Sequence, residues 1–173
     1  MPKVDFVNLM TYGMPTNKRG YTGHHSVLFS SSYQTESIDK SIRYLDSLKI
    51  PLNKIVIGAA FYSFVVQDVD SVNQGLGQKG KFKANVNYKQ IVENYTVQNG
   101  YNYYWDSIAK APYLYNAKER IFVTYDDIRS VGLKTDYAIQ KKLGGIMFWK
   151  LNGDTSTDGL LNSIYSHFNT SYK

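Results

Sequence analysis

The sequence contains no cysteine, which excludes both disulfide bonds and thiolate metal ligands. It has no apolar run of the roughly 20 residues that cross a membrane as a helix, so we expect no membrane partner. A run of five or more basic residues is also missing, although the formal net charge is +6. Because the lysines are scattered, they indicate a solvated surface, and we expect no nucleic-acid partner. No signal peptide is visible before the strand-like segment that starts at Val4, so any signal is expected upstream.

The sequence does contain enough apolar residues for one domain of 173 residues, and it has 16 tyrosines. Aromatic side chains suit the apolar faces of sugar rings. Tyrosine is also common at half-buried positions, because its hydroxyl can stay in water. The number of tyrosines alone therefore does not distinguish a binding site from ordinary packing.

Residues 144–154 form the most informative segment. Two glycines precede an apolar run of strand length, and a turn-like Asn-Gly-Asp closes it. This pattern predicts a strand buried on both faces, as in parallel sheets. Met147 and Trp149 share one face, and Trp149 comes at the carboxyl end, where α/β barrels carry their active sites. The structural alternative is that Met147 and Trp149 only fill the core.

Residues 4–12 and 54–62 predict two further strands. The first begins almost at the start of the sequence, and its one face carries Phe6, Asn8, Met10 and Tyr12. A buried Asn8 would need hydrogen-bond partners. The second is an apolar run that ends at Tyr62. Between them, a helix from residue 35 has the apolar stripe Ile38, Ile42, Leu45 and Leu48, which predicts a parallel βαβ unit.

Residues 13–33 are rich in Gly, Ser, Thr and Asn, which predicts a long loop. In a barrel such a loop lies on the catalytic face. The loop contains His24 and His25, but no third ligand occurs at metal-binding spacing. We therefore expect exposed loop histidines, with no metal site and no cofactor.

Residues 65–124 are too long for an ordinary crossover connection. An amphipathic segment at 88–94 and strand-like segments at 101–106 and 121–125 predict a small α+β subdomain. Its aromatic residues are expected mainly to form its own core, although they are also able to stack on sugars: Tyr101, Tyr103, Tyr104, Trp105 and Tyr113. Residues 75–80 spell Gly-x-Gly-x-x-Gly, but no crossover helix opens there, which excludes a dinucleotide site.

Two helices are predicted on either side of residues 144–154. Residues 130–143 predict a helix that turns Tyr137, Ile139 and Leu143 inward and has Gly144 as its cap. After Asp154, either Thr157 or Asp158 is expected to cap a last helix. The apolar stripe of that last helix consists of Leu160, Leu161, Ile164, Tyr165 and Phe168.

These segments resemble the carboxyl-terminal part of the barrel of glycoside hydrolase family 18 chitinases, over roughly residues 3–168. Residues 144–154 match the motif Gly-Gly-x-Met-x-Trp-x-x-x-Gly-Asp of the last strand, whose Trp forms the floor of the sugar subsite beside the scissile bond. Met10 and Tyr12 match the Met-x-Tyr-Asp end of the sixth strand, where the Tyr binds the N-acetyl group. The remaining matches are Gly58, Phe61 and Tyr62 in the seventh strand, the chitinase insertion domain at 65–124, and Ser130 and Lys134 in a Ser-x-x-x-Lys element.

The resemblance implies an α/β fold, namely a partial (β/α)₈ TIM barrel (strands 6 to 8) with an inserted small α+β subdomain. Residues 1–64 and 125–173 would belong to the barrel and residues 65–124 to the chitinase insertion. The implied substrate-binding residues are Met10, Tyr12, Tyr62, Met147 and Trp149. The implied partners are chitin or N-acetylglucosamine oligosaccharides, and the implied location is secreted or extracytoplasmic.

The sequence departs from the family pattern at three places. Gly13 replaces the Asp that helps to position the N-acetamido group, and Ser63 and Phe64 replace the Gly-Arg that follows Tyr62. The motif Asp-x-x-Asp-x-Asp-x-Glu, which ends in the general acid, does not occur, and residues 65–72 imitate it only in part. No catalytic residue is therefore assigned, the general-acid Glu is expected upstream, and we expect no hydrolysis by this chain alone. The alternatives are a lectin-like barrel that binds N-acetylglucosamine, or a relative directed at peptidoglycan or the spore coat.

Three barrel strands are identifiable where a (β/α)₈ barrel has eight, so the sequence is expected to be a fragment. Three strands alone would leave two sheet edges and an apolar inner row open. We therefore expect the chain to associate with the missing amino-terminal half of the barrel or with itself.

Overall fold

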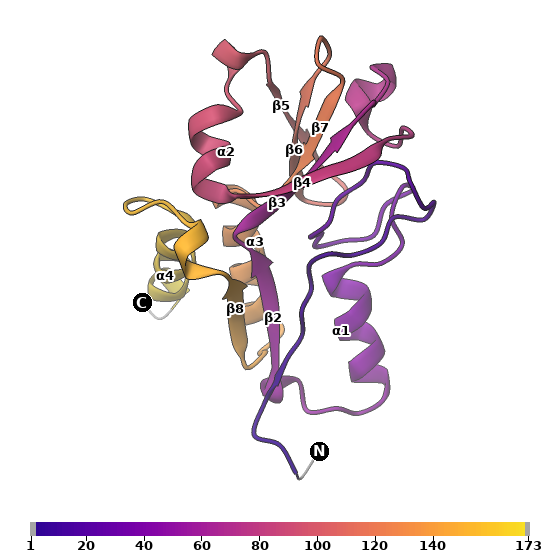
Figure 1. Ribbon diagram of the computed structural model, residues 1–173. Coiled ribbons are helices and arrows are strands. Elements are labelled where there is room, and N and C mark those ends of the chain that lie inside the picture. Colours follow the sequence, from indigo (N-terminus) through magenta and orange to yellow (C-terminus); the bar gives the residue numbers. More distant parts are fainter. Residues whose placement is uncertain (1–2, 172–173) are drawn as a thin grey trace.

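The computed structural model describes residues 3–171 and contains two sheets (Figure 1). The parallel sheet has the strand order β1-β2-β8, and the antiparallel sheet has the order β4-β3-β7-β6-β5. In Figure 1 the antiparallel sheet and α2 stand above the parallel sheet, with α1 to one side of β2 and α4 to the other. The strands are β1 (Val7–Asn8), β2 (Ile55–Ala60), β3 (Tyr62–Gln67), β4 (Lys81–Asn87), β5 (Asn102–Asp106), β6 (Ala111–Asn116), β7 (Ile121–Thr124) and β8 (Gly145–Trp149). The helices are α1 (Ile38–Ser47), α2 (Tyr88–Asn94), α3 (Ile128–Gln140) and α4 (Leu160–Ser171), with short 3₁₀ segments at Leu52–Lys54, Val72–Gly75, Val97–Asn99 and Leu151–Gly153.

The predicted βαβ unit is present, because β1 and β2 are parallel and α1 lies between them in the sequence. The helix starts three residues later than predicted. Its N-cap is Ser37, whose side chain accepts a hydrogen bond from the Lys40 N–H at 3.1 Å. Ile38 and Ile42 of the predicted stripe are buried, whereas Leu48 lies beyond the helix and is 54% exposed.

The first strand is much shorter than the predicted residues 4–12. Only Val7–Asn8 pairs with β2. Farther along, the Thr11 hydroxyl replaces backbone pairing, because it accepts a hydrogen bond from the Gly58 N–H at 2.7 Å and donates one to the Gly58 carbonyl at 2.8 Å. Asn8 is not buried and therefore needs no such partners. Asn8 is exposed on the open face of the sheet, as is Met10.

Strand β8 is parallel to β2, as predicted, and Trp149 lies opposite Ala60. The expectation that β8 is buried on both faces is wrong. Ile146 and Phe148 pack against the core, but Trp149 on the other face is 59% exposed. No further layer covers that face within residues 3–171.

Helix α3 begins two residues earlier than predicted. Asp127 is its N-cap and forms a capping box with Ser130. Gly144 does not end the helix, because Lys142 takes the left-handed conformation there, with φ 53°. Gly144 is required for a different reason, since a Cβ at this position would lie 2.7 Å from the Asn53 carbonyl oxygen.

Helix α4 is capped by Asp154, and not by Thr157 or Asp158 as predicted. The Asp154 carboxylate accepts hydrogen bonds from the N–H groups of Leu160 and Leu161 at 2.9 and 2.8 Å. The predicted stripe is narrower than expected. Its buried members are Leu160 and Ile164, and its exposed members are Leu161 and Tyr165.

The antiparallel sheet and α2 occupy the region where an α+β subdomain was predicted. Strands β5 and β7 and helix α2 occur at the predicted segments, while β3, β4 and β6 were not predicted. Between β2 and β3, the Phe61 N–H donates to the Trp149 carbonyl at 2.8 Å. Tyr62 therefore opens β3 instead of ending β2, and the second sheet starts three residues before the predicted boundary at residue 65.

Apolar clusters lie on both sides of the antiparallel sheet and on one side of the parallel sheet. The first joins the antiparallel sheet to α2, α3 and α4, and Phe61 is fully buried in it. The second joins β2 to α1 and α3, and the third covers the opposite face of the antiparallel sheet. Within residues 3–171, every helix is too short or too polar to cross a membrane.

Candidate functional site

A cavity of about 530 Å³ lies where the carboxyl ends of the parallel strands meet the β3–β4 hairpin. Four of the five residues that the sequence predicts for substrate binding line this cavity: Met10, Tyr12, Tyr62 and Trp149. Its remaining wall consists of Phe64, Asn85, Asn87 and Lys150. Parallel strands run in one direction, so residues at their carboxyl ends gather at one edge of the sheet. The fold therefore brings together residues that are up to 140 positions apart, from Met10 to Lys150.

The fifth predicted residue, Met147, lies beside the cavity and supports it. Its sulfur is 3.9 Å from the Tyr12 hydroxyl. Both side chains pack over Gly58, where a Cβ would lie 2.7 Å from the Tyr12 ring and 3.0 Å from Met147 Cε. Only glycine at this position allows Tyr12 to reach Tyr62, whose ring centroid is 5.9 Å away in an edge-to-face arrangement.

Both tyrosine hydroxyls stay protonated at neutral pH. Burial raises the pKa of Tyr62 to about 12, with smaller contributions from Tyr12 and Asp126. Burial also raises the pKa of Tyr12. The cavity thus offers two neutral hydroxyl groups next to an exposed indole. No carboxylate is among its lining residues.

Two of the departures from the family motifs meet at one place beside this cavity. A Cβ on Gly13 would lie 3.9 Å from Phe64 Cζ and 4.0 Å from the Tyr62 hydroxyl. An acidic side chain at position 13 and a basic one at position 64 would therefore be neighbours. In this chain the pair is replaced by a glycine and an aromatic ring, so this wall of the cavity carries no charge.

The expectation of exposed loop histidines is wrong, because the loop at 13–33 folds over the antiparallel sheet. His24 and His25 are only 1% and 2% exposed. His24 Nε2 lies 3.1 Å from an Asp106 carboxylate oxygen. The His25 ring packs behind the cavity, 5.1 Å from the Tyr62 ring and 4.6 Å from the Phe64 ring.

His25 is an uncharged part of this wall. Burial lowers its pKa to about 3, and the nearby Asp126 opposes that shift. Within the described residues, neither ring nitrogen makes a hydrogen bond of regular geometry. A polar contact with the Tyr62 main chain raises the His25 pKa, but by less than burial lowers it. Sequence reasoning missed His25, and the residues around it give no local signal of burial.

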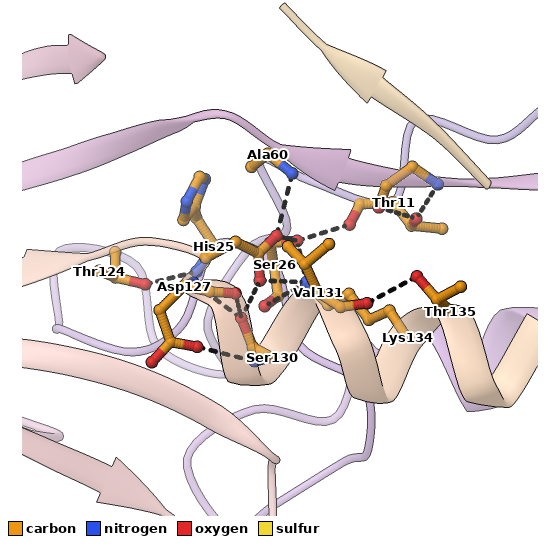
Figure 2. Close-up of polar contacts among 12 residues, drawn as sticks. Thr11, His25, Ser26, Ala60, Thr124, Asp127, Ser130, Val131, Lys134 and Thr135 are labelled. Carbon is orange, nitrogen blue, oxygen red and sulfur yellow. Dashed lines mark hydrogen bonds and ion pairs between the residues drawn. The ribbon is translucent and has the colours of Figure 1, made fainter. Parts of the chain in front are cut away.

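A buried polar network fixes the end of β2 (Figure 2). Lys134 Nζ and the Asp126 carboxylate form an ion pair at 2.5 Å, and both side chains are fully buried. The same carboxylate accepts hydrogen bonds from the Ala60 N–H at 2.9 Å and the Ser26 hydroxyl at 3.0 Å. Figure 2 shows Lys134 and Ser130 on one helix, both pointing at the loop that carries Ser26. The predicted Ser-x-x-x-Lys element thus holds the chain just before Tyr62.

Both partners of this ion pair have lowered pKa values. Burial acts to raise the pKa of Asp126, but the attraction and hydrogen bond of Lys134 outweigh it, so the carboxyl stays ionised. Burial lowers the pKa of Lys134, and Asp126 opposes that shift.

Other parts of the described chain are weaker candidates. A larger groove lies between α2 and the β8–α4 connection, but it shares no residue with the aromatic cavity. The aromatic residues considered at 101–113 line no part of the cavity; Tyr113, for example, is buried and stacks on Tyr104 at 5.2 Å. Residues 3–171 contain no group of three or more His, Asp or Glu side chains placed to hold a metal ion.

The comparisons with known proteins agree on one family. Residues 1–154 match the profile described as Glycosyl hydrolases family 18. Chitinase A1 of Niallia circulans is 32% identical over 169 residues, which cover 87% of this chain and 24% of that protein. A glycoside hydrolase family 18 N-acetylglucosaminidase from Paenibacillus barengoltzii is 38% identical, with a TM-score of 0.84 over 95% of this chain and 49% of that one. A class V chitinase mutant from Nicotiana tobaccum, solved in complex with NAG4, is 22% identical, with a TM-score of 0.84 over 95% of this chain and 49% of that one.

The chain spans about a quarter of the curated relative and about half of each of these solved chains. Over that part, its parallel sheet and its inserted antiparallel sheet match the chitinase barrels of the family. The family match extends over far more than half of the sequence. This chain belongs to glycosyl hydrolases family 18.

Proposed function

We propose that β1, β2 and β8 are the sixth, seventh and eighth strands of a family 18 (β/α)₈ barrel. In this proposal residues 1–64 and 125–173 belong to the barrel, and residues 65–124 form the chitinase insertion. The support is the direct pairing of three parallel strands, together with the position of the antiparallel sheet between β2 and α3 in the sequence. The three strands deliver their carboxyl ends to one side, where barrel enzymes bind substrate.

The proposed role of this chain is to bind N-acetylglucosamine rings of chitin. Trp149 would lie under the apolar face of a sugar ring, and Tyr62 and Tyr12 would bind its polar acetamido group. Met10 and Met147 would shape the apolar parts of the site. The observation that carries the proposal is that Tyr12, Tyr62 and Trp149 line one cavity although they come from three separate segments.

For the complete protein we propose hydrolysis of β-1,4-linked N-acetylglucosamine with retention of configuration. In the substrate-assisted mechanism, the acetamido oxygen of the substrate attacks the anomeric carbon while a glutamic acid protonates the leaving group. This chain would position the acetamido group, and the acid would come from a part of the protein outside these 173 residues. We propose a location outside the cytoplasm, because chitin is an extracellular polymer.

Titration of the 173-residue chain with the trisaccharide of N-acetylglucosamine tests the proposal. We expect saturable binding by calorimetry, and the Trp149→Ala variant should bind at least about tenfold more weakly, because stacking area is lost. The same trisaccharide without acetyl groups should also bind more weakly, since the tyrosine hydroxyls lose a partner. No release of fluorophore from a chitobioside substrate is expected.

Tyr165→Ala is the matched control for Trp149→Ala. Tyr165 is a similarly exposed aromatic residue, at 65%, but it lies on α4 and outside the cavity. Its variant should bind like the parent chain. Equal affinity of the Trp149→Ala variant and the parent would refute the proposal.

A lectin-like protein is the second candidate, and the uncharged wall at Gly13 and Phe64 favours it. That wall lacks the carboxylate and the guanidinium that the family motif provides. The residue at the end of the fourth-strand motif in the complete gene distinguishes the two candidates, because a Glu supports an enzyme and Gln or Leu supports a lectin. A peptidoglycan-directed relative would instead bind muropeptide glycans more tightly than chitin oligosaccharides.

A further inference from the structure

The β3–β4 hairpin continues the wall of the cavity away from the barrel strands. The two strands are antiparallel, with Asn87 opposite Tyr62 and Asn85 opposite Phe64. Residues directly opposite each other in such a pair share a face of the sheet. The cavity therefore borders a surface of the hairpin on which aromatic rings and amide side chains face each other.

A β-bulge adds a third aromatic ring to this surface. Simple alternation from Asn87 and Asn85 would place Lys83 next on the same face and turn Phe82 away. The register shifts between Val65 and Val66, so that Phe82 lies opposite Val66. The shift places Phe82 on the face of Tyr62 and Phe64. Bulges of this kind re-aim side chains and are frequent beside active sites.

The Phe82 ring is exposed to solvent and contacts one other aromatic ring. Phe82 is 61% exposed, which is unusual for a phenylalanine without a packing role. Its ring centroid lies 5.8 Å from that of Phe64, in an edge-to-face arrangement. Phe64 is in turn held from behind by the His25 ring at 4.6 Å. The two phenylalanines thus form a preformed surface that does not need to order on binding.

A polar group accompanies these rings. Asn85 is exposed, lines the cavity beside Phe64, and its side chain makes no hydrogen bond within residues 3–171. An aromatic platform with a free amide at its border suits a sugar ring, which has an apolar face and an equatorial rim of hydroxyl groups.

We propose that Phe64, Phe82 and Asn85 form an additional saccharide subsite, which binds the next ring of the oligosaccharide held in the cavity. The occupant is inferred from continuity, because Phe64 and Asn85 belong both to the cavity wall and to this surface. Pairing of β4 with a second copy of the chain is disfavoured, since the lysines at 81 and 83 protect this edge strand. The proposal rests on the proposed function, and it adds a preference for longer oligosaccharides.

Calorimetric titration of the 173-residue chain with the disaccharide and the hexasaccharide of N-acetylglucosamine tests the inference. The parent chain should bind the hexasaccharide more tightly. Phe82→Ala should weaken hexasaccharide binding by about five- to tenfold and leave disaccharide binding unchanged, because only the longer ligand reaches this ring. Asn85→Ala should weaken hexasaccharide binding more than disaccharide binding, with some loss for both, because Asn85 also lines the cavity that holds the shorter ligand.

Val97→Ala is the control, because Val97 is 72% exposed in the 3₁₀ segment Val97–Asn99 and does not line the cavity. Circular dichroism should show all three variants folded like the parent. Unchanged hexasaccharide affinity in Phe82→Ala, with a loss in Trp149→Ala, would overturn the subsite and leave the proposed function standing. Equal affinity of the parent for both ligands would also overturn the subsite. Absence of binding to either ligand would overturn both proposals.

Discussion

Tyr62 has the candidate cavity on one side of its ring and His25 on the other. Motif matching selects Tyr62 as a binding residue. It does not select His25, because the sequence of the loop that carries His25 is polar and predicts exposure. In the folded chain that loop covers the face of the antiparallel sheet next to Tyr62 and Phe64. His25 then lacks the water that would stabilise an imidazolium ion, and its pKa falls to about 3.

We predict that His25 makes the chain sensitive to mildly acidic pH. The unfolded chain binds a proton at His25 near the ordinary pKa of 6.5, whereas the folded chain does so only near 3. Stability should therefore be highest above pH 6.5 and fall as the pH decreases through this window. Between about pH 7 and pH 5 this effect amounts to about 2 kcal/mol in the free energy of unfolding. Urea denaturation at the two pH values measures it.

The His25→Gln variant separates this effect from those of other groups. It should lose about 2 kcal/mol less than the parent over the same pH interval. The Asp126 pKa lies below its ordinary value, so this carboxyl contributes its own acid sensitivity only at lower pH. Identical pH dependence of the parent and the variant between about pH 7 and pH 5 would show that His25 is not the titrating group.

At the level of elements, helix α4 shows how a cap can lie several residues from the place that local spacing suggests. Thr157 and Asp158 immediately precede the apolar stripe, which makes them the obvious candidates. The chain instead turns back so that Asp154, at the end of the family motif, meets the first N–H groups of the helix. The same carboxylate accepts a hydrogen bond from the Thr155 N–H at 2.9 Å, which closes the turn.

We predict that Asp154→Ala lowers the free energy of unfolding by about 1 to 2 kcal/mol, because two N–H groups at the start of α4 lose their acceptor. Asp154→Asn should lose less, since an amide oxygen still accepts hydrogen bonds. Thr157→Ala is the control at the position that the sequence suggested, and it should change stability by less than about 0.5 kcal/mol. Equal losses in Asp154→Ala and Thr157→Ala would contradict the observed cap.

For the whole molecule, the described chain leaves one face and two edges of the parallel sheet open. Strands β1 and β8 each have one neighbour in residues 3–171. Phe6, Met10 and Trp149 are 60%, 74% and 59% exposed on this side. Burial of a large apolar side chain stabilises by about 1.5 to 3 kcal/mol, so three such residues are a large fraction of the roughly 5 to 15 kcal/mol of a typical domain.

We predict that the 173-residue chain associates with itself at high concentration, or with a separately produced amino-terminal half of the barrel. Sedimentation velocity over a range of concentrations should show a rising sedimentation coefficient. Replacement of Phe6 and Met10 by lysine should shift the chain toward the monomer. A compact monomer at every concentration would contradict this prediction.

Oligosaccharide binding should oppose this association by mass action, because Trp149 belongs both to the cavity and to the open face. Binding experiments are therefore best performed at concentrations where sedimentation shows the monomer.

Features set by neighbours in the sequence were predictable for this protein. The spacing of apolar residues indicated α1, β2, α3 and α4, and the motif around Trp149 indicated β8. Together with the motifs of the other two strands, it selected four of the eight residues that line the cavity. These patterns work because a helix or strand repeats over a few residues, and because motif residues lie next to each other in the chain.

Only the tertiary structure decided which faces are covered. It buried His25 in a polar loop, moved the caps of α3 and α4, left Trp149 exposed, and placed Phe82 on the same face as Phe64 through a bulge. Each of these outcomes depends on segments that are distant in the sequence and meet only in the fold. Burial and strand register depend on contacts between distant segments, so no local pattern of residues predicts them.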